Sequence, residues 1–566
     1  MVLTLPMRYR RLLLTATLIL FSPLIVAAAE VFKPPAAAIA AAHPLATEAG
    51  ITIINQGGNA FDAAIAVTAA LAVVEPAGSG LGGGGFWLLH RESDGFQTMV
   101  DGRERAPLSA HRDMYLDRQG NIIPRLSING PLAAGIPGVP AALEHLANKY
   151  GSLPLSQNLA PAIALARNGF AVDERYQRLI NFRLRAMQQS PAAAAIFLHN
   201  NEAPDIGYIV KQPDLANTLQ AMANDGAAGF YSGPVAKRLI EGTRAAGGIW
   251  TLDDLTQYKI EERTPIKSRY KNIEVTSAAP PSSGGIALAT MFQILENYSL
   301  DKLDNTTRVH LITEAMRRAY RDRAEYLGDT DFVSVPIERL SHPFYAAGLA
   351  STIHPSQATP SSQLPGIADN RQGTDTTHFS ILDRDGNRVA ATLSINYPFG
   401  AAFVPPGTGV LLNDEMDDFS SKPGTPNVYG LVGNRANEIA PGKRPLSSMS
   451  PTFLEDENRV AILGTPGGSR IITMVLLGAL EFAANKPPQD WVSAPRFHHQ
   501  YLPDQLSFEP GIFDKKTISA LEAMGHNLKA RGRNYGNMQA ILWDRAQNRV
   551  MAASDPRGNG LASTIE

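Results

Sequence analysis

The sequence predicts a mixed α/β (α+β) protein that forms one structural unit. Apolar residues recur at helical spacing between positions 46 and 74, and the pattern is mainly helical from about residue 152 to 325. After position 376 the pattern changes to the alternation that is typical of strands. A chain of 566 residues could hold three or four domains of about 150 residues each, but no Gly/Ser-rich or charged linker divides it.

The N-terminus has the features of a secretory signal peptide. Three arginines up to Arg11 precede an apolar stretch over residues 12–26, and the small residues Ala27–Ala29 follow. We therefore expect residues 1–29 to be a signal peptide, with export of the protein and cleavage near Ala29. The alternative is an uncleaved membrane anchor, although the apolar run is short for a spanning helix of about 20 residues.

Composition excludes several kinds of partner and site. The net charge is -2, and no Lys/Arg cluster follows the signal region, which argues against nucleic acid as a partner. The absence of cysteine excludes disulfides, cysteine nucleophiles and thiolate metal sites. We expect neither a cofactor nor a metal.

The first half of the chain contains a glycine motif that needs interpretation. Residues 78–83 fit the spacing of a dinucleotide-binding loop, but a strand-like run, Phe86–Leu89, follows where a helix would be required. The motif therefore does not predict nucleotide binding. Further along, residues 351–374 are polar and rich in Pro, Ser and Gln, and we expect this segment to be flexible and exposed.

A β-hairpin is predicted directly after this segment. Residues 376–382 and 388–396 alternate, and the sequence Asp385-Gly386-Asn387 between them is typical of a turn. A three-residue loop would place Ser394 or Asn396 opposite Thr376, whereas a two-residue loop would place Ile395 there. The polar candidates favour the odd loop.

Thr376 is the candidate nucleophile, and it needs a base. A threonine hydroxyl can use its own α-amino group once that group is a free N-terminus, which requires cleavage between Asp375 and Thr376. The alternative is that the Thr376-Thr377 pair only forms a strand, since threonine favours strands. His378 shares a face with Thr376 but lies one pleat further on, and we expect it to be a packed or hydrogen-bonded residue.

Three later segments supply polar groups that could complete a site. Residues 411–419 hold acidic side chains between apolar ones, and residues 443–452 hold paired hydroxyls after a proline. In the third segment, residues 464–470, tandem glycines precede an apolar helix over 471–480. Backbone N–H groups at such a position suit an anion or a developing oxyanion.

Taken together, these segments resemble the γ-glutamyltranspeptidase (glutathione hydrolase) family of the N-terminal nucleophile hydrolase superfamily. The resemblance implies a four-layer αββα sandwich and a proenzyme that cuts itself before Thr376. The expected parts are the signal peptide 1–29, a large subunit 30–375 and a small subunit 376–566, which stay together as a heterodimer. The motifs that carry the resemblance are residues 101–104, 376–380, 413–419, 445–452 and 466–469.

The resemblance also implies a role for each residue of the site. Thr376 would be the nucleophile, with the hydroxyl of Ser394 beside it where the family often has threonine. Gly467 and Gly468 would bind the oxyanion, and Tyr429 would lie in a lid loop over residues 423–437. The substrate's α-carboxylate would bind to Arg103, Ser447 and Ser448, and its α-ammonium to Asp418, Glu415 and Asn396.

The implied reaction is cleavage of the γ-glutamyl amide bond of glutathione and related small molecules. The γ-glutamyl group would pass from Thr376 to water or to an amino acid or peptide, with no nucleic acid or, after signal removal, membrane involved. One alternative is a related acylase that cleaves glutaryl groups from β-lactams, which would have no need of an ammonium acceptor. Another is an exported protein that binds γ-glutamyl compounds without cleaving them.

Overall fold

The computed structural model of the protein describes residues 32–364, 376–422, 424–425 and 427–566. The expected signal peptide and Asp375 therefore lie outside the described residues. Residues 34–566 form one compact unit, and no division separates the part before Thr376 from the part after it.

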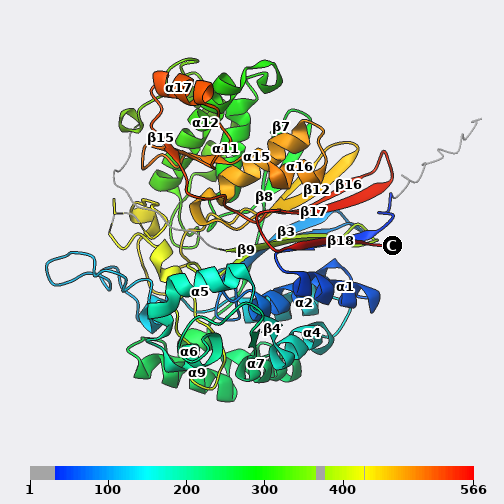
Figure 1. Ribbon diagram of the computed structural model, residues 1–566, viewed down its shortest axis with the longest axis vertical. Coiled ribbons are helices and arrows are strands. Elements are labelled where there is room, and N and C mark those ends of the chain that lie inside the picture. Colours follow the sequence, from blue (N-terminus) through cyan, green and yellow to red (C-terminus); the bar gives the residue numbers. More distant parts are fainter. Residues whose placement is uncertain (1–31, 365–375, 423, 426) are drawn as a thin grey trace, which may run out of the picture. The chain divides into compact units, whose positions relative to one another are not determined.

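Two antiparallel sheets form the centre of this unit (Figure 1). The seven-stranded sheet has the order β18-β1-β9-β10-β2-β3-β6, and the six-stranded sheet has the order β17-β16-β12-β11-β8-β7. Both sheets thus combine strands from before and after position 376. The strands of the first are β1 (Ala37–Ala41), β2 (Gly84–Arg91), β3 (Phe96–Gly102), β6 (Glu261–Arg263), β9 (Thr377–Leu382), β10 (Arg388–Ser394) and β18 (Leu561–Ile565); those of the second are β7 (Ile266–Tyr270), β8 (Ile273–Ser277), β11 (Thr452–Glu455), β12 (Arg459–Gly464), β16 (Gln539–Asp544) and β17 (Arg549–Ser554).

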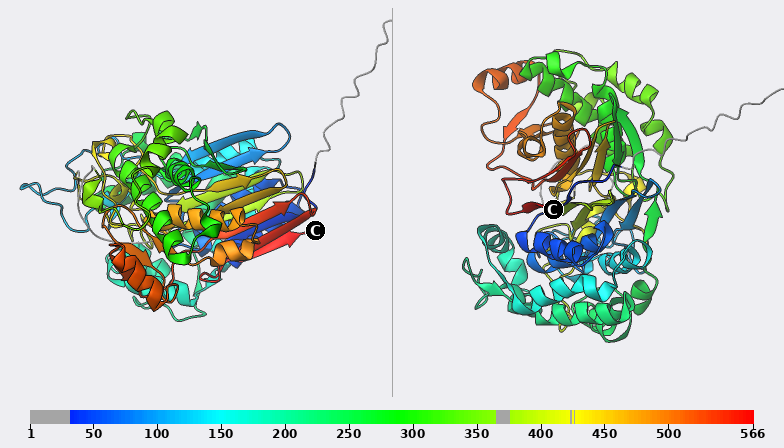
Figure 2. Two further views of the ribbon diagram at one scale, coloured as in Figure 1. Left: turned by 90° about the horizontal axis from the view of Figure 1, so that it is seen from above. Right: turned by 90° about the vertical axis from the view of Figure 1, so that its right-hand side faces the viewer.

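Helices cover the outer face of each sheet (Figures 1 and 2). The layer on the seven-stranded sheet contains α1 (Pro44–Asn55), α2 (Ala60–Val74), α3 (Val139–Lys149), α4 (Leu155–Asn168), α5 (Glu174–Met187), α7 (Pro213–Asp225) and α9 (Gly233–Ala245). The layer on the six-stranded sheet contains α11 (Gly284–Leu295), α12 (Asn305–Tyr326), α15 (Ile471–Ala483) and α16 (Pro488–Ser493).

Alternation along the strands separates two hydrophobic cores. Ile39 and Trp87 pack in the core between the seven-stranded sheet and its helices. Their neighbours Ala38 and Phe86 pack in the core that the two sheets share. Because successive side chains point to opposite faces of a strand, this division confirms the predicted helix–sheet–sheet–helix sandwich.

Helix α2 illustrates why the alanine-rich region near the N-terminus is buried. All of its 15 residues are buried, as expected of a helix that is apolar all round. Asn59 and Asp62 form a capping box at its start, and Asp62 also accepts hydrogen bonds from Ser152 and Asn158. The prediction of buried helices over residues 46–74 is confirmed.

Other sequence expectations divide into confirmed and corrected ones. Strand β2 directly follows residues 78–83, so the glycine motif lacks the helix that a nucleotide would need.

The expectation that residues 351–374 form an exposed segment is wrong for part of it. Ser361 is buried, because its N–H donates to Asp504 and its hydroxyl donates to the carbonyl of Tyr501. Residues 365–374 lie outside the described residues.

Candidate active site

Thr376 directly precedes strand β9, which begins at Thr377, and it is 3% exposed. The hairpin connection between Leu382 and Arg388 is residues 383–387, so it is odd in length, as expected, but longer than the predicted three residues. In this register Thr377 pairs with Leu393. The next position in this register places Ser394 opposite Thr376. Gly78 allows a close approach of the backbone, since a Cβ atom there would lie 3.2 Å from the carbonyl oxygen of Thr376.

A cavity of about 20 Å³, here called the Thr376 pocket, gathers most of the predicted site residues. Of the predicted site residues that the structure describes, Glu415 and Gly467 are absent from its lining. No individual role was predicted for Leu431, Met449, Ser469 or Ile471, because no local pattern distinguishes these residues from their neighbours. The lining consists of Arg103, Thr376, Ser394, Asn396, Asp418, Tyr429, Leu431, Ser447, Ser448, Met449, Gly468, Ser469 and Ile471.

Arg103 is the one basic side chain among the described residues of this lining, and it is held by carboxylates. Its guanidinium contacts Glu415 at 2.7 Å and Asp418 at 2.6 Å, and its Nε donates to the carbonyl of Pro445 at 3.2 Å. Burial alone would lower the pKa of Arg103, but the surrounding carboxylates raise it above its usual value. Arg103 therefore stays charged.

The acidic groups around Arg103 outnumber its single charge. Burial raises the pKa of Glu415 to about 7, an effect that Arg103 and a hydrogen bond with Ser394 oppose. Burial and the neighbouring Glu415 also raise the pKa of Glu104, which lies 3.5 Å from Arg103. Glu415 is thus a carboxyl group that takes up a proton near neutral pH.

Asn396 occupies the turn that follows β10. Its φ of 72° is a left-handed conformation, which asparagine adopts more readily than most residues. Its N–H donates to the hydroxyl of Ser394 at 2.8 Å, and its side-chain amide donates to the carbonyl of Asp414 at 2.9 Å. The bond from the side-chain NH₂ group fixes the amide orientation.

The paired serines differ in how they are bonded. The hydroxyl of Ser447 accepts from the N–H of Met449 at 3.1 Å, and the backbone of Ser447 bridges to Ser282. The hydroxyl of Ser448 is buried and has no hydrogen-bond partner among the described residues. A buried hydroxyl that lines a cavity without a partner is a donor available to a ligand.

The tandem glycines form the turn that leads into helix α15. Gly467 and Gly468 have φ values of 146° and 56°, conformations that disfavour other residues. A Cβ atom at Gly468 would lie 2.6 Å from the ring of Tyr429, so the ring packs directly on this turn. Gly468 lines the Thr376 pocket, whereas Gly467 lines a neighbouring cavity.

The predicted lid loop covers the pocket through specific contacts. The hydroxyl of Tyr429 donates to the carbonyl of Asn396 at 2.5 Å, and the side chain of Asn427 donates to Asp418 at 2.9 Å. Tyr429 is 3% exposed. Positions 423 and 426 of the loop lie outside the described residues.

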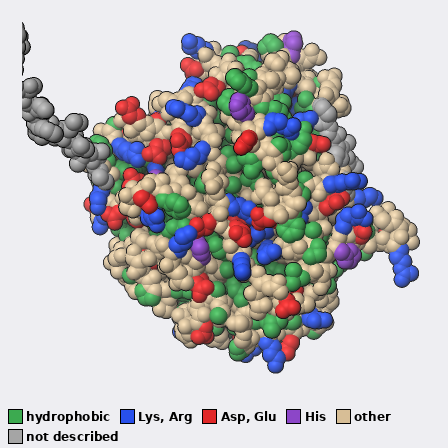
Figure 3. Space-filling model, turned by 180° about the vertical axis from the view of Figure 1, so that it is seen from behind, with side chains coloured by type: hydrophobic (Ala, Val, Ile, Leu, Met, Phe, Trp, Pro, Cys, Tyr) green, Lys and Arg blue, Asp and Glu red, His purple; other side chains and the backbone are tan. Residues whose placement is uncertain are grey.

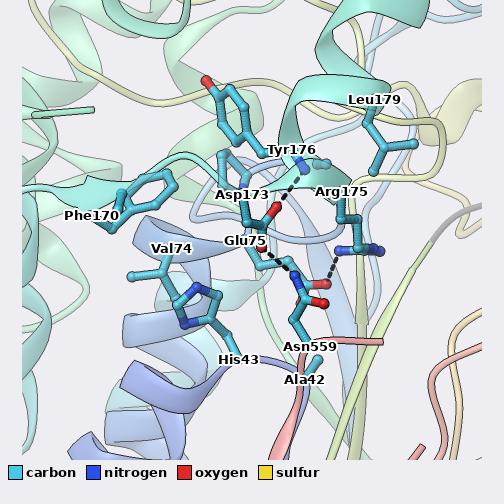
Figure 4. A pocket seen from close by; sticks show the side chains of 13 residues that line it. Ala42, His43, Val74, Glu75, Phe170, Asp173, Arg175, Tyr176, Leu179 and Asn559 are labelled. Carbon is cyan, nitrogen blue, oxygen red and sulfur yellow. Dashed lines mark hydrogen bonds and ion pairs between the residues drawn. The ribbon is translucent and has the colours of Figure 1, made fainter. Parts of the chain in front are cut away.

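Thr377 points to the opposite face of the strand. Its hydroxyl donates to Glu75 at 2.5 Å, and Glu75 also pairs with Arg175 of helix α5. Figure 4 shows Glu75 and Arg175 in a small cavity, beside the hydrogen bond between Asn559 and Asp173. Sequence reasoning expected Thr377 to be structural but missed Glu75 and Arg175, which are distant in the chain.

His378 is a buried structural residue, as predicted. Its ring contacts the hydroxyls of Thr392 at 2.8 Å and Ser380 at 3.3 Å. Burial lowers its pKa to about 3, so the ring is neutral and both contacts are hydrogen bonds between uncharged groups.

Charged side chains of both signs are interspersed on the surface. The face shown in Figure 3 carries Lys and Arg next to Asp and Glu, without a continuous basic patch. Among the described residues, no helix is both long enough and apolar enough to cross a membrane.

Two stacked sheets between helical layers, with a buried threonine directly before an inner strand, define the class of N-terminal nucleophile hydrolases. The profile of the γ-glutamyltranspeptidase family matches residues 46–565. The chain belongs to this family. It is 42% identical to the "Glutathione hydrolase proenzyme" of Pseudomonas sp. (strain A14), with 93% of each chain covered. It is also 42% identical to the protein of that name from Escherichia coli (strain K12), over 93% of this chain and 92% of the relative. Among solved structures, a cephalosporin acylase from Bacillus halodurans superimposes with a TM-score of 0.83 at 27% identity, over 97% of this chain and 99% of the other.

Proposed function

We propose that this protein is a self-cleaving glutathione hydrolase and γ-glutamyltransferase in which Thr376 is the nucleophile. The observation that carries the proposal is the Thr376 pocket itself. One small cavity combines Thr376 with a fixed cation, Arg103, an acidic side chain, Asp418, and an unpartnered hydroxyl, Ser448. These groups complement the carboxylate and ammonium of an amino-acid head group.

Self-cleavage produces the mature N-terminus. The hydroxyl oxygen of Thr376 attacks the carbonyl carbon of Asp375, the bond to the Thr376 nitrogen breaks, and that nitrogen gains a proton as the ester forms. Water then hydrolyses the ester, which leaves a carboxylate on Asp375 and restores the Thr376 hydroxyl beside a free α-amine. The products are a large subunit over residues 30–375 and a small subunit over residues 376–566.

The same hydroxyl then performs the reaction on substrate. The α-amine of Thr376 takes the hydroxyl proton, the oxygen attacks the γ-carbonyl carbon, and the amide bond breaks as its nitrogen receives the proton. Water or an amine resolves the resulting ester. N–H groups of Gly467 and Gly468 stabilise the oxyanion, where losing one donor typically costs about 2.7–4 kcal/mol.

Substrate binding exchanges one set of ion pairs for another. The α-carboxylate binds to Arg103 with Ser447 and Ser448, and the α-ammonium binds to Asp418 with Glu415 and Asn396. The contacts between Arg103 and the two carboxylates, at 2.7 and 2.6 Å, support this because they already place opposite charges at the required ends. A zwitterion can insert between them without leaving a buried charge unpaired.

The small size of the pocket supports a lid that moves. A cavity of about 20 Å³ holds about one water molecule, which is far less than a γ-glutamyl group. Tyr429 and Leu431 line the pocket from the loop side. Their displacement admits substrate, and their return excludes bulk water from the acyl-enzyme.

We propose export as the destination of the protein. The arginines and the apolar stretch before Ala29 support a cleaved signal peptide. The mature two-subunit enzyme then acts in the periplasm or outside the cell.

A glutaryl acylase is the second candidate, because the superimposed solved structure is called a cephalosporin acylase. A glutaryl group has no α-ammonium, and the buried Glu415 and the partly buried Asp418 near Arg103 then have no substrate partner. Hydrolysis of a γ-glutamyl anilide at a rate well above that of a glutaryl anilide supports the proposal, and the reverse preference contradicts it.

N-terminal sequencing of the smaller fragment tests the cleavage. We expect the sequence Thr-Thr-His-Phe-Ser, which begins at Thr376. Any other start would overturn the assignment of the nucleophile, and a single mature chain on a denaturing gel would instead favour a non-catalytic binding protein.

A further inference from the structure

A second buried arginine lies behind the wall of the Thr376 pocket. Arg323 belongs to helix α12, is 4% exposed, and donates from its Nε to the hydroxyl of Ser283 at 3.0 Å. In the described part of the chain it forms no ion pair with a carboxylate, and neither substrate binding nor catalysis, as proposed, uses it. Because a buried charge without a partner costs free energy, the contacts of Arg323 need an explanation.

Arg323 stays charged at neutral pH in spite of its burial. Burial lowers the pKa of Arg323 to about 10, although Asp418 and Tyr320 oppose this effect, and Arg103 adds to it. Asp418 and Arg103 both line the Thr376 pocket. Arg323 is therefore a cation within electrostatic reach of the residues that are proposed to bind the substrate's head group.

Helix α12 touches the wall of the pocket at two places. It belongs to the layer that covers the six-stranded sheet (Figure 1). Tyr320 and Arg323 are three residues apart and so lie on the same face of the helix. The hydroxyl of Tyr320 donates to the carbonyl of Ser469, which lines the pocket. Because this bond does not involve Arg323, it holds the helix in place when Arg323 is replaced.

Ser283 connects Arg323 to the paired serines of the pocket. The hydroxyl of Ser283 donates to the carbonyl of Ser447 at 2.7 Å, and its backbone N–H donates to the same oxygen at 2.9 Å. Arginine is only a donor, so it occupies a lone pair of the Ser283 hydroxyl and leaves the proton for Ser447. All three residues are buried, and bonds between them are stronger than bonds in water.

The bonds to this carbonyl fix the orientation of the peptide between Ser447 and Ser448. In a planar trans peptide the carbonyl oxygen and the following N–H point in opposite directions. A carbonyl that is held by Ser283 therefore directs the N–H of Ser448 away from Ser283. The hydroxyl of Ser448 has no partner among the described residues, so the backbone alone sets its position in the pocket.

The loop over residues 280–285 holds the paired serines at further points. The N–H of Ser447 donates to the carbonyl of Pro281 at 2.8 Å, and the hydroxyl of Ser282 donates to the carbonyl of Met449 at 2.6 Å. These bonds are independent of Arg323 and Ser283. Loss of either side chain should thus change the orientation of one peptide without releasing the loop.

We propose that Arg323 is a positioning residue for the substrate's α-carboxylate and that it acts through Ser283. Its guanidinium directs the hydroxyl of Ser283 toward the carbonyl of Ser447, and that bond holds the peptide before Ser448 in the orientation that the carboxylate needs. The inference rests on the proposed function, to which it adds two residues that do not touch the substrate.

The test compares two anilides that differ only in the α-carboxylate. A γ-glutamyl anilide carries this group, whereas a 4-aminobutyryl anilide keeps the ammonium and lacks the carboxylate. For Arg323→Gln and for Ser283→Ala we expect kcat/KM with the γ-glutamyl anilide to fall about ten-fold. The loss should lie in KM, with kcat changed less than about two-fold, because the carboxylate takes no part in the chemical step.

The second anilide separates positioning from general damage. Both variants should retain kcat/KM for the 4-aminobutyryl anilide to within about two-fold, since this substrate has no carboxylate to position. Equal losses with both anilides would overturn the proposal, and so would unchanged kinetics with the γ-glutamyl anilide.

A double variant tests whether Arg323 acts through Ser283. Arg323→Gln combined with Ser283→Ala should lose about ten-fold, like either single variant, because both changes interrupt the same chain of hydrogen bonds. A combined loss of about 100-fold would show two independent effects and would contradict the path through Ser283.

Ser277→Ala is the matched control. The hydroxyl of Ser277 is also buried and donates to a backbone carbonyl from beyond the cut site, that of Pro451 at 3.1 Å, but Pro451 is outside the lining of the pocket. We expect unchanged kinetics with both anilides, and a loss equal to that in Ser283→Ala would contradict a specific role. Cleavage before Thr376 reports folding of every variant, and Ser283→Ala decides the test if Arg323→Gln stays uncut.

The unsubstituted enzyme distinguishes failure of this inference from failure of the proposed function. If it does not hydrolyse the γ-glutamyl anilide, or hydrolyses both anilides equally well, the proposed function is refuted. If it prefers the γ-glutamyl anilide and the variants keep the full preference, only the role of Arg323 and Ser283 is refuted.

Discussion

Thr376 and Thr377 are adjacent, identical in type and both buried, yet their surroundings differ completely. Thr376 faces a small cavity whose polar groups include Arg103 and the unpartnered hydroxyl of Ser448. Thr377 faces the carboxylate of Glu75, to which its hydroxyl donates at 2.5 Å. A nucleophile needs a neighbouring space for the substrate, whereas a structural hydroxyl needs a permanent acceptor. Because successive side chains of a strand point to opposite faces, Thr376 faces the cavity and Thr377 faces the acceptor.

Replacing the nucleophile should separate the two threonines by the largest effect on activity. We expect Thr376→Ala to remain a single uncut chain with activity reduced on the order of a million-fold, the loss seen when a hydrolase loses its nucleophile. Thr377→Ala should still be cut before position 376. Gel electrophoresis and an anilide assay measure both effects, and a cut Thr376→Ala chain would refute self-cleavage by this residue.

Arg103→Lys tests the cation on the Thr376 side. Lysine keeps the charge but cannot bind a carboxylate with a planar fork, so we expect kcat/KM for glutathione to fall about thirty-fold, or about 2 kcal/mol. The chain should still be cut. Arg105→Lys is the matched control, because Arg105 lies two residues away and donates to the carbonyl of Gly442 instead. Equal losses in both variants would argue against a substrate contact at Arg103.

The pH dependence of activity sharpens the role of Glu415. Its pKa of about 7 means that it becomes protonated, and loses the charge that attracts an ammonium, as the pH falls below 7. The α-amine of Thr376, with a reference pKa of about 7.7–8, is also protonated at low pH and then cannot act as a base. We expect the slope of log kcat/KM against pH to approach two on the acid side and to fall to one in Glu415→Gln. An unchanged slope would show that Glu415 does not titrate in the active enzyme.

Thr377→Val tests the structural side, since valine keeps the shape and removes the hydroxyl. We expect cleavage before Thr376 to persist while the free energy of unfolding falls by about 1.5–3 kcal/mol, because the buried carboxylate of Glu75 loses a donor. Unfolding is best measured in the uncut Thr376→Ala background, where one chain unfolds as a whole. Thr377→Ser should retain most of the stability, and equal losses in both variants would assign the effect to packing.

The smallest effect is expected at Ser394, opposite Thr376. Ser394→Thr adds a methyl group that restricts the hydroxyl to fewer rotamers, and we expect kcat to change by less than about three-fold. A loss above ten-fold, measured with the same anilide, would mean that the pocket has no room for the methyl group.

Local patterns predicted the elements that depend on their own sequence. The buried helices over residues 46–74, the strand after residues 78–83 and the odd-length connection before β10 all follow from neighbouring residues. The strand alternation likewise separated Thr376 from Thr377. The four-layer arrangement was predicted from family resemblance, because periodicity alone does not give the order of strands in a sheet.

Contacts between residues far apart in the chain could not be predicted from the sequence. Glu75 is 302 residues from Thr377, and nothing in its local pattern indicates a hydroxyl partner. The ion pairs of Arg103 with Glu415 and Asp418 were equally hidden, since the resemblance implied substrate contacts for each residue but no contact between them. The cavity that Gly467 lines combines residues near 175, 531 and 557 that only the fold brings together.

The order of strands favours folding of the seven-stranded sheet before the chain is cut. Strands β9 and β10 lie between β1 and β2, so residues from after position 376 are enclosed by residues from before it. As a single chain, the precursor assembles this interleaved sheet by a unimolecular reaction. Once cut, the same sheet can be rebuilt only by two molecules that meet, at a rate that depends on their concentration. The covalent link therefore assists folding only once, before cleavage. If the cut enzyme unfolds, its two subunits refold at a rate that falls as the protein is diluted.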